Sequence, residues 1–374
     1  MFRLQLKNNK NTNFYMNNHG IIITSPSLDT NKNIGGISTV TSFVISNNPS
    51  YRYDHFELGK LDEEKRGIAW LFRILKAWGK WGFLMIKEKD LIIHFNFALD
   101  KRSIIRDSPL ILFSQILNKK LVIHLHGGVY LEKDDIPFWI KTLLKLIFKG
   151  KAPKIVLSQG EKEIIMKKYN AKNVMALPNS ISLKEAGDFN RIYTTESHVK
   201  LLYIGRIVKT KGLDYIFEAL QILKEQNIPF KFLFAGSGPE KDSYVDKFSH
   251  TFGPSFEYKG VVTGKEKIDL LKECSIFLLP SFYEGLPISL LECMSFGLVP
   301  VVTPIGSMKD LIKNKENGIF VKMKSSVEIA EAVEYLVNNP DSLKIIGSNA
   351  RKYIFENHNP IDYINKLNHI YETV

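Results

Sequence analysis

The stretch SFYEGLPISLLECMSF at residues 281–296 joins two patterns that decide the fold class. The apolar run Ile276–Pro280 just before it predicts a short buried strand. Gly285 then predicts a turn, and Pro287 is typical of the first residue of a helix. The apolar spacing predicts that this helix continues to Gly297, a residue type that often ends helices. A strand, a turn and a helix in this order form the repeating unit of a parallel α/β sheet.

The amino end of this predicted helix is suited to hold an anion. Free backbone N–H groups and a partial positive charge occur at such an end, so the loop Glu284-Gly285-Leu286-Pro287 can receive a phosphate. Glu284 lies just outside the helix, and Glu292 lies one to two turns inside it. Ionised carboxylates only accept hydrogen bonds, so both could accept them from sugar or ribose hydroxyls. The stretch therefore suits a nucleotide sugar.

The same alternation of apolar strands and amphipathic helices runs through most of the chain, which favours βαβ units around parallel sheets. Ligands bind beyond the carboxyl ends of the strands in such folds. The predicted strands are 20–25, 90–95, 120–124, 154–158, 200–204, 230–235, 256–259, 276–280 and 299–303. The predicted helices are 38–45, 64–81, 136–148, 160–169, 212–225, 240–248, 265–273 and 287–296, followed by helices only from residue 327 onward.

The length of 374 residues indicates two domains, each large enough to bury a core. The polar stretch 182–197 has no apolar periodicity and is the predicted hinge. We expect a first Rossmann-like domain over residues 1–185, with a polar leader at 1–19, and a second Rossmann-like domain over residues 186–374. We also expect the two domains to face each other across a cleft, with a C-terminal helix crossing back.

The charge distribution points to an acidic partner. The chain has 51 Lys and Arg against 39 Asp and Glu, and residues 1–190 hold 29 of the basic and 17 of the acidic residues. The candidates are nucleic acid, an anionic membrane and a phosphorylated substrate. Cys274 and Cys293 form neither a disulfide framework nor a metal-binding spacing, which favours a reducing cytoplasm. The sequence shows no secretory signal, and no apolar stretch approaches the roughly 20 residues needed to span a bilayer.

Several segments together resemble the retaining GT-B glycosyltransferases of family 4. The glutamates of EGLPISLLE are the most specific of them, and the resemblance covers about residues 20–330. The other segments are LYIGRIVKTKG at 202–212, FLFAGSGPEKD at 232–242, YKGVV at 258–262, Gly35-Gly36, HLHGG at 124–128 and LPNSIS at 177–182.

The resemblance implies a donor site in the second domain. Arg206 and Lys211 would neutralise the donor diphosphate, as two cations in a strand-to-helix loop can do. Glu292 would hold the ribose hydroxyls. The remaining implied donor contacts are Gly285 and Leu286 in the phosphate loop and the backbone of Val261 and Val262, which would edge the base.

The resemblance also implies which residues meet the transferred sugar. Glu284 and His126 would contact it and serve as the catalytic pair. Gly35 and Gly36 would let a first-domain loop approach the diphosphate closely, which a side chain would prevent. Ser180 stands where the family usually has glycine, so the turn beside the cleft departs from the family pattern.

The implied reaction is transfer of a hexose-type sugar with retention of anomeric configuration, by attack on the face from which the diphosphate departs. The chain contains no Asp-x-Asp triplet, so no metal requirement and no other cofactor are expected. Arg206 and Lys211 would stand in for a metal. A UDP-sugar is the favoured donor, although the resemblance does not exclude a GDP-sugar.

Two stretches of the basic half place aromatic and aliphatic residues among Lys and Arg. These are AWLFRILKAWGK at 69–80 and IPFWIKTLLKLIFKGK at 136–151. Helices at a membrane interface combine an apolar face with flanking cations and Trp, so either could dock on an anionic bilayer. The alternative is a helix packed on the sheet with a solvated basic face. No nucleic-acid-binding motif is legible, so we do not expect nucleic acid as a partner.

These patterns favour a cytoplasmic enzyme, peripheral on the inner face of the membrane, that acts on a lipid-linked saccharide in bacterial surface polysaccharide synthesis. Three alternatives stay open. They are a transferase with a soluble acceptor, a nucleotide-sugar 2-epimerase, and a nucleotide-sugar-binding protein without turnover.

Overall fold

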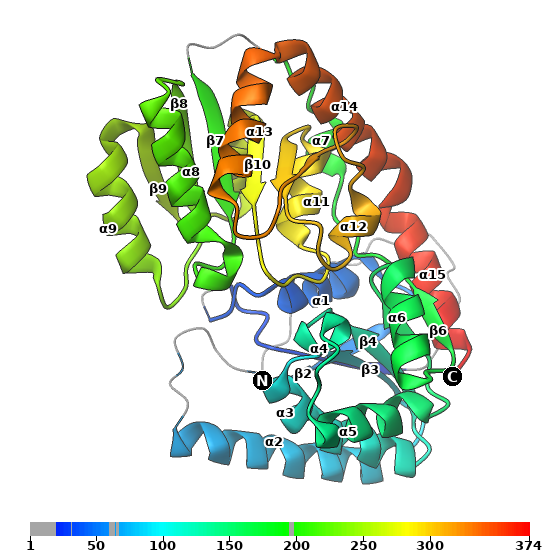
Figure 1. Ribbon diagram of the computed structural model, residues 1–374. Helices are drawn as coiled ribbons and strands as arrows, with labels where there is room; N and C mark the ends of the chain where they lie inside the picture. Colours follow the sequence, from blue (N-terminus) through cyan, green and yellow to red (C-terminus); the bar gives the residue numbers. More distant parts are fainter. Residues whose placement is uncertain (1–19, 31, 60–63, 65–66, 194–197) are drawn as a thin grey trace.

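The computed structural model describes residues 20–30, 32–59, 64, 67–193 and 198–374. The leader at 1–19 and residues 194–197 of the predicted hinge lie outside the described residues. The chain forms two α/β domains, each built on a parallel six-stranded sheet (Figure 1). This confirms the predicted fold class. The predicted domain boundary at residue 185 lies between the strands of the two sheets and remains a prediction.

The first sheet has the strand order β2-β1-β3-β4-β5-β6, with parallel pairing throughout. Its central strands are buried along almost their whole length because helices cover both faces of the sheet. The strands are β1 (Gly20–Ser25), β2 (Arg52–Glu57), β3 (Ile92–Phe97), β4 (Lys120–Leu125), β5 (Lys154–Val156) and β6 (Val174–Ala176).

The helices of this domain form two layers on the sheet. Core residues of α2, α3, α5 and α6 pack with one set of alternating strand side chains, and those of α1 pack with the other set. The helices are α1 (Gly36–Asn47), α2 (Ile68–Lys87), α3 (Lys101–Ile116), α4 (Val129–Glu132), α5 (Phe138–Lys149), α6 (Gln159–Tyr169) and α7 (Lys184–Gly187).

The second sheet has the order β12-β11-β10-β7-β8-β9 and is also parallel. Its strands are β7 (Val199–Ile204), β8 (Phe230–Ala235), β9 (Phe256–Gly260), β10 (Ile276–Leu279), β11 (Val299–Val302) and β12 (Ile319–Phe320). Its helices are α8 (Leu213–Glu225), α9 (Lys241–Phe252), α10 (Gly264–Glu273), α11 (Ile288–Ser295), α12 (Met308–Leu311) and α13 (Ser326–Asn338), with 3-10 turns at Lys209–Lys211 and Gly253–Ser255.

The last two helices join the domains (Figure 1). Helix α14 (Pro340–Asn357) packs against α11 and β11 of the second domain, whereas α15 (Pro360–Glu372) packs against α1 of the first. Near the end of α15, the Tyr371 hydroxyl lies 2.6 Å from Nδ1 of His94 on β3. The predicted return of a C-terminal helix to the first domain is therefore confirmed.

Within the described part of the chain, no helix combines the length and the apolar character needed to cross a membrane.

Candidate functional site

Helix α11 begins one residue later than predicted. Pro287 has extended backbone angles (φ −64°, ψ 127°) and occupies the N-cap position, so Ile288 is the first helical residue. The N–H groups of the first turn have no partner within the helix and face the preceding loop. At the other end α11 stops at Ser295, and Gly297 adopts a left-handed φ of +79°, as predicted for a glycine that ends a helix.

An ion pair joins two of the predicted site residues beside this helix. Nζ of Lys211 lies 2.5 Å from Oε1 of Glu284, and both side chains are mostly buried. The backbone N–H of Phe282 donates to the Thr210 carbonyl at 2.8 Å, so the loops that follow β7 and β10 are tied together. These strands are neighbours in the sheet, which is why the two loops meet at one carboxyl edge.

The loop after β7 passes very close to the end of β10. Gly212 has a φ of +76°, and a Cβ atom there would lie 2.2 Å from the Pro280 carbonyl oxygen, so only glycine fits. The Tyr203 hydroxyl donates to the Arg206 carbonyl at 2.6 Å and fixes the backbone where the chain leaves β7. Arg206 and Lys211 therefore lie on one short loop at the carboxyl edge of the second sheet.

Glu292 has a cationic partner that sequence reasoning missed. Nζ of Lys267 lies 2.6 Å from Oε1 of Glu292 and holds this carboxylate toward α10. Lys267 sits in the first turn of α10, directly after the predicted base-contacting loop of Val261 and Val262. Side-chain accessibility at Val261 is 44%, so this loop is open to solvent. The sequence shows no signal for Lys267, since it is one of several lysines on an amphipathic helix.

His126 is held in a defined tautomer at the end of β4. Nδ2 of Asn96 donates to the Thr24 carbonyl (2.6 Å) and to Oγ1 of Thr41 (3.0 Å), which assigns Oδ1 of Asn96 as an acceptor. Nε2 of His126 therefore carries a hydrogen and donates to Oδ1 at 2.7 Å. Burial, helped by nearby His94, lowers the pKa of His126 to about 3. At neutral pH the ring is uncharged, with Nδ1 as its acceptor.

Backbone contact between glycines brings the His126 segment to the loop of Glu284. A Cβ atom at Gly127, where φ is +72°, would lie 2.6 Å from the Cα atom of Gly285. A Cβ atom at Gly285 would lie 2.8 Å from the His126 carbonyl oxygen, and one at Gly306 would lie 2.2 Å from that of Glu284. The two predicted catalytic residues therefore belong to loops that touch across the domain boundary.

Gly35 and Gly36 lie at the start of α1, which packs against α11 between the domains (Figure 1). The backbone N–H of Gly35 donates to Oδ1 of Asn33 at 2.8 Å. Gly35 has an ordinary φ of −71°, so backbone conformation does not require glycine there. No described atom lies within 4 Å of a Cβ atom built on Gly36, so that residue borders open space. Packing among the described residues therefore does not require glycine at position 36.

The segment containing Ser180 contacts the loop that precedes α11. Nδ2 of Asn179 donates to the Leu286 carbonyl at 2.9 Å, a contact that sequence reasoning missed. The Ser180 hydroxyl donates to the His358 carbonyl at 2.7 Å, and Nδ1 of His358 donates to the Asn179 carbonyl at 2.7 Å. Serine is therefore accommodated at this position, where it anchors the junction between α14 and α15.

A buried carboxyl group also bridges the two domains. Oε1 of Glu161 accepts from the Ser307 hydroxyl at 2.8 Å, and Oε2 accepts from the Leu157 N–H at 3.0 Å. Burial raises the pKa of Glu161 to about 7, and the nearby carboxylates of Glu132 and Asp310 act in the same direction. The folded chain therefore keeps this carboxyl group mostly protonated at pH values below about 7.

This raised pKa predicts a pH-dependent stability that Glu161→Gln removes. The folded pKa of about 7 exceeds the ordinary value of 4.5. The contribution of Glu161 to the free energy of unfolding is therefore fully present below about pH 4.5 and is lost as pH rises through 7. Glutamine keeps hydrogen-bonding groups without ionising. In thermal unfolding, the midpoint of Glu161→Gln minus that of wild type should be larger at about pH 8 than at about pH 5. The same midpoint difference at both pH values would contradict this assignment.

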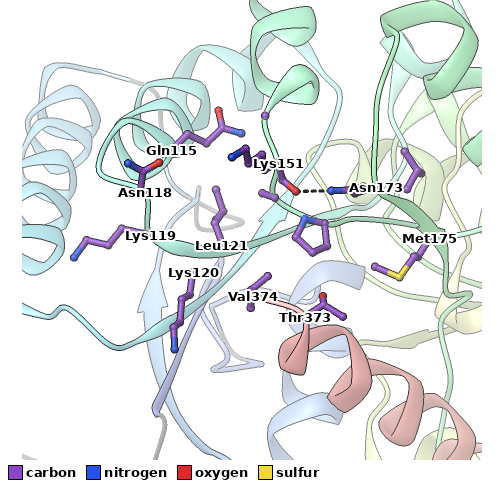
Figure 2. Close-up of a pocket in the computed structure, with 14 residues that line it drawn as sticks. Gln115, Asn118, Lys119, Lys120, Leu121, Lys151, Asn173, Met175, Thr373 and Val374 are labelled. Carbon is purple, nitrogen blue, oxygen red and sulfur yellow. Dashed lines mark hydrogen bonds between the residues drawn. The ribbon is translucent and has the colours of Figure 1, made fainter.

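A cavity of about 770 Å³ lies elsewhere, at the amino ends of β4, β5 and β6 beside the C-terminus (Figure 2). Its lining includes Lys119, Lys120 and Lys151, but none of the predicted site residues. Asn173 at its edge donates from Nδ2 to the Lys151 carbonyl at 2.8 Å. This cavity therefore lies at the opposite end of the first sheet from the predicted site residues.

Comparison with known proteins identifies relatives of the chain. The family described as glycosyl transferases group 1 matches residues 188–353. An uncharacterised glycosyltransferase of Methanocaldococcus jannaschii is 30% identical over 50% of this chain and 48% of its own length, so the match spans about half of that relative. A capsular polysaccharide biosynthesis glycosyltransferase of Staphylococcus aureus is 26% identical over 81% of each chain. The UDP-Gal:alpha-D-GlcNAc-diphosphoundecaprenol alpha-1,3-galactosyltransferase of Escherichia coli is 25% identical over 58% of this chain and 59% of its own.

Solved structures agree on the fold. Sucrose-phosphate synthase from Thermosynechococcus elongatus superposes with a TM-score of 0.74 at 16% identity, covering 95% of this chain and 98% of that one. The Anabaena protein HepE, solved in complex with UDP and glucose, superposes with a TM-score of 0.70 at 13% identity, covering 95% and 100% of the two chains. The chain has the GT-B fold, and its second domain, over residues 188–353, belongs to the glycosyl transferases group 1 family, also called family 4.

Proposed function

We propose that this chain is a retaining glycosyltransferase that moves a hexose-type sugar from a UDP-sugar to a hydroxyl acceptor. The observation that carries the proposal is the Lys211–Glu284 ion pair at the amino end of α11, directly across from the His126–Gly127 turn. This arrangement sets a cation, a carboxylate and a neutral imidazole around the meeting point of the two domains.

The donor diphosphate would bind between the Lys211 loop and the first turn of α11. An ammonium group has three N–H donors, so Lys211 can keep its bond to Glu284 and still donate to phosphate oxygens. Arg206 on the same loop and the N–H groups of the first turn of α11 would add positive charge. HepE, which has the same fold, was solved in complex with UDP and glucose, which supports a nucleotide-sugar donor.

Glu292 would bind the ribose in this arrangement. Its Oε1 is held by Lys267, which leaves Oε2 to accept from the ribose hydroxyls. The Val261–Val262 loop lies just before the helical turn that contains Lys267, and its backbone would contact the edge of the base.

The transferred sugar would lie between Glu284 and His126. In the transfer step the bond from the anomeric carbon to the diphosphate oxygen breaks, and a bond to the acceptor oxygen forms on the same face. The acceptor proton passes to the departing diphosphate, whose charge the cations stabilise. A neutral His126 would accept a sugar hydroxyl at Nδ1 and orient the ring.

The acceptor we propose is a lipid-diphosphate-linked saccharide at the inner face of the cytoplasmic membrane. The basic first domain supports an anionic acceptor. The Escherichia coli relative is named for a diphosphoundecaprenol acceptor, and the Staphylococcus aureus relative for capsular polysaccharide synthesis.

The test is to incubate the protein with UDP-hexoses and a polyprenyl-diphosphate-linked saccharide and to follow the anomeric protons by NMR. The proposal predicts a new glycoside with the anomeric configuration of the donor. An inverted product, or an epimerised nucleotide sugar formed from the donor without acceptor, would contradict it. Transfer only to a free saccharide would support the proposed reaction but contradict the proposal of a lipid-linked acceptor.

A further inference from the structure

Helix α2 has two apolar faces, and one of them is exposed. Its buried side chains Ile74, Trp81 and Met85 pack into the first domain. A second set of apolar side chains lies on a different face at helical spacing, where an ordinary surface helix would carry polar residues. Its most exposed members, with their exposed fractions, are Ile68 (76%), Phe72 (66%), Phe83 (69%) and Ile86 (70%), and Leu71 and Leu75 are about half exposed.

Neighbouring helices extend this exposed surface. Helix α3 contacts both α2 and α5 and so lies between them (Figure 1). We call the combined area the basic apolar surface. It consists of the α2 residues named above with Lys76, Lys80 and Lys87, of Ile105 and Ile116 on α3, and of Phe138, Trp139, Lys141, Lys145, Leu146 and Lys149 on α5.

The charge of this surface has one sign. Helices α2 and α5 together hold seven Lys and Arg residues and no Asp or Glu within 68–87 and 138–149. On α2 the residues Lys76, Lys80 and Lys87 lie four and seven positions apart, so they form a row along one side of the exposed apolar stripe. An apolar stripe beside a lysine row is the arrangement that binds the interface of an anionic bilayer.

We propose that the basic apolar surface docks on an anionic lipid bilayer. The single-sign charge favours this partner over a second copy of the chain, because pairing two such surfaces would bring like charges together. A bilayer supplies both of the complementary parts, since its acyl region receives Phe72, Phe83 and Phe138 and its headgroups attract the lysines.

The surface reaches the edge of the sheet where the candidate site lies. In a parallel α/β domain each helix starts at the carboxyl edge of the sheet, so the first turns of α2 and α5 are near that edge. Phe138 and Trp139 follow the His126–Gly127 turn through the single turn of α4. Given the proposed transfer to a lipid-linked saccharide, docking here would deliver the acceptor headgroup to the mouth of the site.

The experiment is cosedimentation of the full chain with vesicles of phosphatidylcholine, with and without phosphatidylglycerol. We expect binding to the anionic vesicles only, weakened by salt, and weakened at least roughly tenfold in both Phe72→Ser/Phe83→Ser and Lys76→Glu/Lys80→Glu. The matched control is Val327→Ser/Ile345→Ser, which removes exposed apolar residues from α13 and α14 and should bind like wild type.

Wild-type protein that stays in solution with anionic vesicles overturns the proposal, as does equal loss of binding in the control variant. Light scattering without lipid tests whether a second copy of the chain covers the surface instead. A wild-type dimer that becomes monomeric in Phe72→Ser/Phe83→Ser would assign the surface to that second copy. Thermal shifts with UDP-sugars report separately on the donor site and should be the same in all of these variants. Failure of docking and failure of the proposed reaction are therefore distinguishable.

Discussion

Lys211→Ala is expected to lower the rate of sugar transfer by about 10²–10³-fold, the usual effect of removing one group that stabilises transition-state charge. Lys211 would stabilise the departing diphosphate, and it also holds the carboxylate of Glu284 at 2.5 Å. Removing the amine leaves Glu284 mostly buried without this cation and takes one positive charge from the diphosphate site. The measurement is steady-state kinetics with a UDP-hexose and a saturating acceptor.

Lys209→Ala is the matched control, since Lys209 is a cation in the same 3-10 turn that is not paired with Glu284 in the described structure. Its rate should stay within a few-fold of wild type. Lys211→Arg keeps the charge but not the geometry and should fall between the two. Equal transfer rates for Lys211→Ala and Lys209→Ala would show that Lys211 does not act in the donor site.

Gly127→Ala is expected to disrupt both stability and transfer. The left-handed φ of +72° costs any other residue about 1–2 kcal/mol. In addition, the new Cβ atom would lie 2.6 Å from the Cα atom of Gly285, so two backbones must separate. This displacement moves His126 away from the Glu284 loop, and a misplacement of about 1 Å can cost roughly 10²-fold in rate. Calorimetry and steady-state kinetics on the same sample measure both effects.

Gly253→Ala separates backbone strain from this contact. Gly253 also has a left-handed φ, +51°, but no described atom lies within 4 Å of its Cβ position. We expect Gly253→Ala to lose only the strain energy and to keep its transfer rate. If the two variants unfold at the same temperature and have the same activity, the close approach of Gly127 to Gly285 is needed neither for stability nor for transfer.

The alternating elements were predictable wherever a strand is buried on both faces. The runs at 20–25 and 230–235 match β1 and β8 residue for residue, because a strand covered on both sides needs a continuous apolar segment. The strand, loop and helix around Glu284 were also predicted, although α11 starts at Ile288 and not at Pro287. The local sequence was sufficient there because residues typical of turns and helix ends mark where each element begins and ends.

Elements without such a pattern were missed. Strand β2 reads RYDHFE and lies at the edge of its sheet, half exposed, so it lacks an apolar run. Helix α3 contains Pro109, and the buried Asp107, paired with Arg106, interrupts its apolar periodicity. The predicted helix 64–81 starts at Ile68 and extends to Lys87, because the exposed apolar stripe obscures which face is the core.

The partners of the site residues could not be predicted from local sequence. Lys267 meets Glu292, Asn96 meets His126, and Asn179 supports Leu286 across the domain boundary. Each pair joins residues from different elements, and only the packing of those elements brings them together. The roles of the site residues toward a donor remain predictions.

The most direct test of the donor site is a thermal-unfolding screen of the full chain against UDP-, GDP-, ADP- and dTDP-sugars. A ligand that binds only the folded state raises the unfolding midpoint by mass action. We predict a selective rise with UDP-sugars that is lost in both Lys211→Ala and Glu292→Ala. No rise with any nucleotide sugar, or a rise that persists in both variants, would contradict a donor site at the amino end of α11.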